Sequence, residues 1–175
     1  MEPKHKRRVR YKGTHPKKYN EKYKELNPEL YPEKIEKVIK KAGIDGRKVV
    51  GIGLSGQMHG LVMLDEKGEL LRRSIIWCDQ RAVRETEKML EILPVEKWLE
   101  ITGNPPIAGW TAAKILWVKE HEPELYEKCR HILLPKDYVR WALTGIYGAD
   151  VSDASGMQLM DLRNRVWSEE ILELL

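Results

Sequence analysis

The sequence predicts a mixed α/β fold in which helices outnumber strands. Short apolar runs bounded by turn-forming residues indicate strands at 49–54, 61–64 and 132–134. Between and after these runs, apolar residues recur at helical spacing, and prolines and glycines stand where helices should begin and end. At 175 residues, the chain has room for one domain with its own hydrophobic core.

Charge divides the chain near residue 24. Residues 1–24 hold ten lysines and arginines against two acids, whereas the rest of the chain is net acidic. We therefore expect a basic, disordered arm over 1–24, a short helix and linker over 25–45, and the domain over 46–175. The alternative is that the arm binds RNA, because clustered cations release counterions from a polyanion. The residues that would do so are Lys6, Arg7, Arg8, Arg10 and Lys12.

The stretch 49–81 organises the domain. Its first apolar run predicts a buried strand, which ends in the loop SGQMHG, where two glycines bracket polar groups. A hairpin follows, with its turn at 65–68, and its second arm delivers an aromatic residue beside an acid and a base. A strand, a polar loop and a hairpin arranged in this way are typical of a pocket for a polar small molecule.

The remaining elements are predicted by their apolar periodicity and punctuation. Pro94 ends one helix, Pro123 and Pro135 open others, and Gly43 and Gly145 suit helix stops. The expected helices span 25–43, 80–93, 96–101, 111–120, 123–129, 136–143 and a last segment from residue 168. Residues 150–161 are expected to form a loop and then a strand.

The motif GQMHG, followed by the hairpin and by IIWCDQR, resembles the sugar-binding region of xylulose kinases, which belong to the FGGY carbohydrate kinases. The resemblance continues through ITGNPPIAGWTAAKILWVKEHEPELY, HILLPKDYVRWALTG and DVSDASGMQLMDLRNRVWS, and it covers about residues 46–175. It implies a partial N-terminal domain of the actin-like, ribonuclease-H-like fold, rich in helices and without the first strands. That loss would leave the edge of strand 49–54 unpaired, with a risk of self-association.

The resemblance also implies a set of sugar contacts. In this family the Met-His pair contacts the ketose, which gives this role to Met58 and His59. Trp77 would form one wall of the pocket, and Asp79 would accept hydrogen bonds from sugar hydroxyls. The supporting residues would be Gln57 and Arg81.

The residue types alone favour simpler roles. A histidine in a loop is more often structural, and a tryptophan in this composition is more often part of the core. Asp79 and Arg81 would then form a partly exposed ion pair of little energetic value. Asp150 and Asp153, with two serines, offer oxygen ligands for Mg²⁺, but the resemblance implies a structural role for them. Lys136 is expected at the surface at a helix start.

The function expected from the resemblance is that of an ATP-dependent, Mg²⁺-using cytoplasmic kinase that converts D-xylulose to D-xylulose 5-phosphate. The family's Asp-x-Gly-Thr-Ser phosphate loop and its catalytic Gly-Gly-x-Asp-Asn segment are not found in the sequence. We therefore expect the isolated chain to be inactive and to bind neither ATP nor a metal. The alternatives are RNA binding through the arm, or a non-catalytic remnant.

Residues 1–41 resemble the leader of bacterial class I methyltransferases of the ribosomal-RNA type. The cofactor-binding glycines of a methyltransferase do not follow, so this resemblance implies no methyl transfer. No apolar run approaches the roughly 20 residues that a membrane span requires, and no membrane partner is expected.

Overall fold

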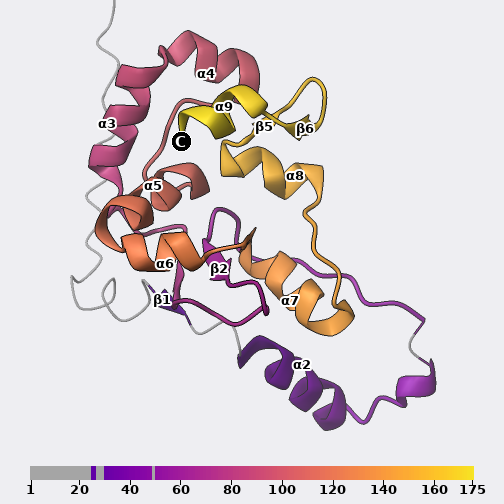
Figure 1. Cartoon of the computed structure of the whole chain (residues 1–175). Helices are drawn as coiled ribbons and strands as arrows, with labels where there is room; N and C mark the ends of the chain where they lie inside the picture. The colour runs from indigo at the N-terminus through magenta and orange to yellow at the C-terminus, as the bar shows by residue number, and fades with distance from the viewer. Residues whose placement is uncertain (1–24, 27–29, 49) are drawn as a thin grey trace, which may run out of the picture.

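The computed structural model describes residues 25–26, 30–48 and 50–175 (Figure 1). The basic arm 1–24, with all its candidate RNA-binding residues, lies outside the described residues. Helices dominate the described part, as the fold class predicts. They are α2 (Leu30–Lys41), α3 (Val83–Ile92), α4 (Val95–Thr102), α5 (Thr111–His121), α6 (Pro123–Lys128), α7 (Pro135–Thr144), α8 (Val151–Ala154) and α9 (Glu169–Leu174), with 3₁₀ turns η1 (Gly46–Lys48) and η2 (Ser155–Met157).

The described strands are short and pair in twos. Their bounds are β1 (Glu25–Leu26), β2 (Val62–Leu64), β3 (Ser74–Ile75), β4 (His131–Leu133), β5 (Met160–Asp161) and β6 (Val166–Trp167). Each pair is antiparallel, and the pairs are β1 with β3, β2 with β4, and β5 with β6. No helix in this part of the chain is long and apolar enough to cross a bilayer.

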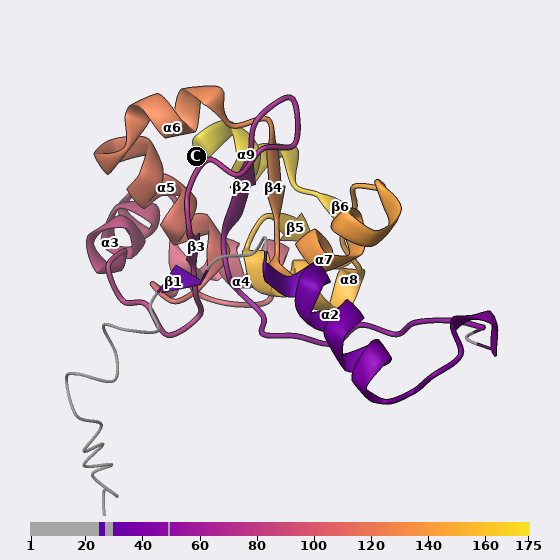
Figure 2. The same ribbon diagram turned by 90° about the horizontal axis from the view of Figure 1, so that it is seen from below.

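Strands β2 and β4 lie side by side (Figure 2). Residues of this pair belong to two apolar clusters. Successive side chains of a strand point to opposite faces, so β2 serves both clusters. Leu61 and Met63 belong to the larger cluster, which α3, α4, α5 and η2 also build. Val62 and Leu64 belong to the smaller one, together with Tyr138 of α7. Strand β2 is therefore buried on both faces, and the loop before it ends on a rigid element.

The hairpin is confirmed around its turn. The Gly68 amide donates to the Asp65 carbonyl at 3.1 Å, and Gly68 has φ 82°, a conformation that glycine adopts without strain. Bridges join Leu64 to Leu70 and Leu61 to Ile75, so the second arm returns along β2. The chain then turns sharply at 76–81, directly after β3.

Glycines and prolines end and begin most helices close to their expected bounds, but the helix expected over 25–43 is only Leu30–Lys41, and strand β1 precedes it. Gly103 and Gly145 adopt left-handed conformations at the ends of α4 and α7, with φ 70° and 73°. Helix α5 is buried on almost every side rather than on one face, because α3, α6 and η2 all pack against it. It lies between α3 and α6 (Figure 1).

The expected buried strand at 49–54 is wrong for the residues described. Residues 50–54 form no strand, Val50 is fully exposed, and Ile52 is 58% exposed. A strand is stabilised by hydrogen bonds to a neighbour, and no described strand lies beside this segment. The expected loop at 150–161 is also wrong in part, because Asp150 accepts a hydrogen bond from the Asp153 amide at 3.1 Å and so caps the short helix α8.

Candidate functional site

The loop Ser55–Gly60 is held against the start of α7. A Cβ at Gly60 would lie 2.4 Å from Cγ of Pro135, and one at Gly56 would lie 3.3 Å from Cβ of Lys136. Only glycine allows so close an approach. Within the loop, Oε1 of Gln57 is buried and has no hydrogen-bond partner among the described residues. This loop therefore presents polar groups from a fixed backbone.

Two other segments hold the imidazole ring of His59, one against a face of the ring and one at its edge. Its ring stacks on Trp110, with centroids 4.5 Å apart and planes inclined by 5°. Its Nδ1 lies 2.9 Å from the carbonyl oxygen of Gly156. A Cβ at Gly156 would lie 2.4 Å from Cε1 of His59 and 3.3 Å from Cε of Met58, so this glycine makes room for both side chains. The structure thus fixes the His59 ring and places the exposed Met58 side chain next to Gly156.

The hydrogen bond to Gly156 also determines the proton on His59. A carbonyl oxygen can only accept, so Nδ1 must carry the hydrogen. Burial lowers the pKa of His59, and the nearby charge of Lys114 lowers it further, against the opposing effects of Gly156 and Asp153. A neutral ring protonated on Nδ1 leaves Nε2 with a lone pair. Nε2 can then accept a hydrogen bond from a hydroxyl group.

Lys114 lies beneath the loop, fully buried within α5. Its Nζ donates to the carbonyl oxygen of His59 at 2.6 Å and also to the carbonyl of Gly109. Burial lowers the pKa of Lys114 to about 7, although the charge of Asp79 opposes this effect. One ammonium group therefore joins the His59 loop to the segment that precedes α5.

Asp79 and Arg81 form an ion pair with several hydrogen bonds. Asp79 is 1% exposed, and its Oδ1 accepts from the backbone amide and Nε of Arg81, while Oδ2 accepts from Nη2 at 2.8 Å. The Arg81 guanidinium lies 4.8 Å from the ring centroid of Trp117. The Asp79 carboxylate is buried and bonded at both oxygens, while the Arg81 side chain remains 23% exposed, so the pair is exposed only on its arginine side.

Trp77 stands apart from the other expected residues. Its side chain is 56% exposed, so the interpretation as a core tryptophan is wrong. Among the described residues, no ring contact joins it to His59 or Trp110. Its backbone is nevertheless tightly packed, because a Cβ at Gly109 would lie 2.5 Å from the Trp77 carbonyl oxygen. The indole is free to form a wall for a bound molecule.

Lys136 is not the surface residue that was expected. Its ammonium bonds to Asp137 at 2.9 Å and to Asp150, and it lies 3.2 Å from Asp153. Burial opposes its charge, but these carboxylates outweigh burial and raise the pKa of Lys136. The hydrogen bond from Lys136 lowers the pKa of Asp150 below its usual range. The oxygens offered for Mg²⁺ are therefore already in contact with a lysine ammonium, which all three carboxylates share.

Glu85, Glu120 and His121 also bring metal-ligating atoms together, within 4.8 Å of one another. Glu85 is buried, on α3, and the other two are exposed at the end of α5. Lys88, however, donates to both carboxylate oxygens of Glu120 at 2.5 Å. Because this cation already occupies the carboxylate, we assign no metal to the cluster.

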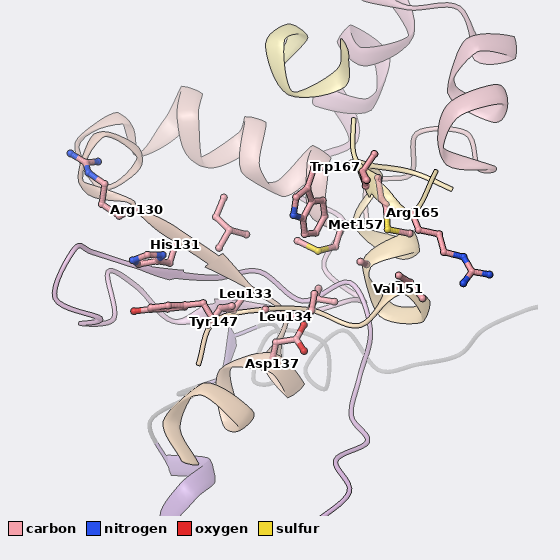
Figure 3. A pocket seen from close by; sticks show the side chains of 16 residues that line it. Arg130, His131, Leu133, Leu134, Asp137, Tyr147, Val151, Met157, Arg165 and Trp167 are labelled. Atoms are coloured by element: carbon pink, nitrogen blue, oxygen red, sulfur yellow. The ribbon is translucent and has the colours of Figure 1, made fainter. Parts of the chain in front are cut away.

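A cavity of about 620 Å³ lies on the other side of η2, between β4, α7, α8 and β6 (Figure 3). Asp137 faces it from α7, opposite Met157 and Trp167. Oδ2 of Asp137 has no hydrogen-bond partner among the described residues, and burial raises the pKa of this carboxyl. None of the expected sugar contacts lines this cavity, so it is separate from the His59 loop.

Sequence reasoning missed three residues that build the His59 environment, namely Trp110, Lys114 and Gly156. Lys114 had a usable signal, because it interrupts the apolar run AAKILW in the helix expected over 111–120. A charged residue at such a position needs buried partners. Trp110 and Gly156 gave no such signal, because their contacts join segments far apart in the sequence.

Comparison with known proteins identifies the family of the chain. The model of the N-terminal domain of the FGGY family of carbohydrate kinases matches residues 4–175. The chain belongs to the FGGY family of carbohydrate kinases. The match begins well before residue 46, where the motif resemblance was expected to start, and the methyltransferase-like leader expected for 1–41 finds no support.

Individual relatives agree with the family. The chain is 42% identical over 141 residues to xylulose kinase of Bacillus subtilis, covering 78% of this chain and 27% of that protein. It is 41% identical over 125 residues to xylulose kinase of Escherichia coli, covering 71% and 25%. The crystal structure of xylulose kinase from Rhodospirillum rubrum matches with a TM-score of 0.80 and 25% identity, covering 86% and 32%. The chain spans about a quarter of the length of these curated FGGY relatives.

Proposed function

We propose that this chain forms the ketose-binding part of an FGGY kinase that converts D-xylulose to D-xylulose 5-phosphate with ATP. The observation that carries the proposal is the fixed His59 ring, whose Nε2 is left as an acceptor for a sugar hydroxyl. The xylulose kinases among the relatives support the choice of ketose.

Four residues would bind the sugar. His59 accepts from a hydroxyl, Met58 offers an apolar wall next to it, and the exposed Trp77 indole covers the C–H face of the sugar. Asp79 completes the site. The bonds from Arg81 to Asp79 fix the turn that carries Trp77, and because Asp79 is 1% exposed, a sugar hydroxyl reaches its carboxylate only if the groups that cover it move.

Gln57 is a supporting residue with an unsatisfied hydrogen-bond acceptor. Its Oε1 is buried without a hydrogen bond, a state that costs about 1–3 kcal/mol. A donor from a bound polyol would remove that cost. Arg81 supports the site less directly, through Asp79 and through its packing over Trp117.

The described residues do not fit ATP or its metal. The spacing Gly51-x-Gly53-x-x-Gly56 matches a phosphate-binding pattern, which works by presenting phosphate to a helix N-terminus. Here the segment leads into strand β2 instead. In each acidic cluster a lysine ammonium, Lys136 or Lys88, already contacts a carboxylate that a metal would need. We therefore propose that the 175-residue chain binds ketose but transfers no phosphoryl group by itself; xylulose-dependent ADP release would contradict this.

A fluorescence titration with D-xylulose tests the binding proposal. We expect a saturable change in tryptophan emission that is lost or strongly weakened in Trp77→Ala. Trp167→Ala is a matched control, because Trp167 is similarly exposed but lines the separate cavity. The proposal would be contradicted if the emission of a folded wild-type chain did not change with D-xylulose, or if both variants lost the emission change equally.

A further inference from the structure

A positively charged side chain inside the apolar core requires an explanation. Lys114 is 0% exposed and is surrounded along its helix by buried residues, among them Ala113, Ile115 and Leu116. Burying an ammonium group is costly unless it is bonded. The charge of Asp79 offsets part of that cost, but the two hydrogen bonds that Lys114 makes within the described part of the chain go to backbone carbonyls.

Those two carbonyls belong to the segments that shape the candidate site. One is the carbonyl of His59, whose φ of 63° is unusual for a residue other than glycine. The other is that of Gly109, whose backbone packs against the Trp77 carbonyl. Lys114 is thus bonded at the same time to the His59 loop and to a segment that contacts the Trp77 turn.

We propose that Lys114 is the positioning residue of this site: its ammonium holds the His59 carbonyl and thereby sets the left-handed backbone that presents the imidazole. The carbonyl points inward to Nζ, so the side chain of the same residue points to Trp110 and Gly156. Lys114 itself, being fully buried, touches no ligand. Its effect on sugar affinity rests on the proposed function, whereas its effect on His59 does not.

The test uses the 175-residue chain with the variants Lys114→Met and Lys114→Gln. Methionine has a similar length but no donor, and glutamine keeps an amide donor on a shorter side chain. Lys119→Met is the matched control on the same helix, because Lys119 is exposed and donates to the Leu175 carbonyl. Each chain is labelled at histidine, and the His59 ring resonances are recorded by NMR without sugar.

In the wild type, stacking on Trp110 should shift the His59 ring resonances away from free-histidine positions. We expect this shift to be lost in Lys114→Met, partly restored in Lys114→Gln and unchanged in Lys119→Met, with helical circular dichroism retained in all. The dissociation constant for D-xylulose should rise about tenfold or more in Lys114→Met, equivalent to about 1.4 kcal/mol.

Unchanged His59 resonances in a folded Lys114→Met would overturn the proposal. So would loss of the fold in both Lys114 variants, because Lys114 would then support the whole core rather than the loop. If the wild type binds no xylulose, the proposed function fails, but the NMR comparison still decides the role of Lys114.

Discussion

At the scale of single residues, His59 is the best-determined group of the candidate site. A non-glycine residue in the left-handed region stores about 1–3 kcal/mol of strain, so other contacts must hold it there. Three do so: the stack on Trp110, the hydrogen bond to Gly156 and the bond from Lys114. The imidazole is therefore oriented before any ligand arrives, which lowers the entropic cost of binding.

Gly156→Ala should disturb this orientation without unfolding the chain. The new methyl group would lie 2.4 Å from Cε1 of His59, so the ring must leave its stack. We expect D-xylulose affinity to fall at least about tenfold, measured by calorimetry. Gly51→Ala is the control, because its Cβ would meet nothing within 4 Å. Equal affinity in the two variants would show that the His59 position does not matter.

Sugar affinity should also depend on the protonation of His59. Its pKa is lowered from the usual histidine value of about 6.5, so the neutral form with a bare Nε2 is favoured at neutral pH. Above about pH 6.5 the His59 ring is neutral, so a change in affinity there reports on Lys114, whose pKa burial lowers to about 7, and not on His59. Affinity should fall at lower pH, as the His59 ring gains a proton on Nε2. Calorimetry at constant ionic strength measures this, and affinity unchanged down to pH 5 would exclude Nε2 as the acceptor.

The sequence predicts the identity of these residues better than their environment. The Met58–His59 pair is found by motif, and the structure places it in a fixed loop. Trp110 and Gly156 were missed because a stack and a close approach depend on tertiary contacts across about 50 and 100 residues. Lys136 was misjudged for the same reason, since two of its three carboxylate partners lie on the α8 segment.

At the scale of elements, helix α8 depends on Asp150. The carboxylate caps the helix by accepting from the Asp153 amide, and it also pairs with Lys136. Asp150→Asn should keep the cap and lose only the charge, at a cost of about 0.5–1 kcal/mol for a half-exposed pair. Asp150→Ala loses both and should cost about 1–2 kcal/mol in urea unfolding. Equal costs would show that the cap contributes nothing.

The Asp150 pair should also be sensitive to acid. Its pKa is lower in the folded chain than in the unfolded chain, so its stabilisation is present above the usual aspartate pKa of about 4. The difference between wild type and Asp150→Asn should shrink progressively as the pH falls from about 5 to about 2, because the unfolded chain takes up the proton while the folded carboxylate is still ionised. A difference as large at about pH 2 as at about pH 6 would contradict the assigned ion pair.

Elements with local signals were predicted well from the sequence. Helices α4 and α7 end at Gly103 and Gly145, and α7 begins at Pro135, because these residues act through their own backbone. The strand at 49–54 was wrong because an apolar run becomes a strand only where another strand pairs with it. Helix α8 was missed because a four-residue helix shows no periodicity.

At the scale of the whole molecule, segment 50–54 exposes apolar side chains to solvent. Val50 and Ile52 are exposed large apolar residues on an unpaired stretch of backbone. Such edges promote association between copies. The double variant Val50→Lys/Ile52→Lys should shift the sedimentation profile towards monomer relative to wild type. If the wild-type chain sediments as a monomer at all concentrations, this expectation is contradicted.

The most direct test of the account is a titration of the 175-residue chain with D-xylulose, followed through the NMR resonances of His59. The account predicts a saturable shift of Hε1 and Hδ2 in the wild type, absent in Gly156→Ala and retained in Gly51→Ala. A folded wild-type chain whose His59 resonances do not move at saturating sugar would contradict the assignment of this loop as the ketose site.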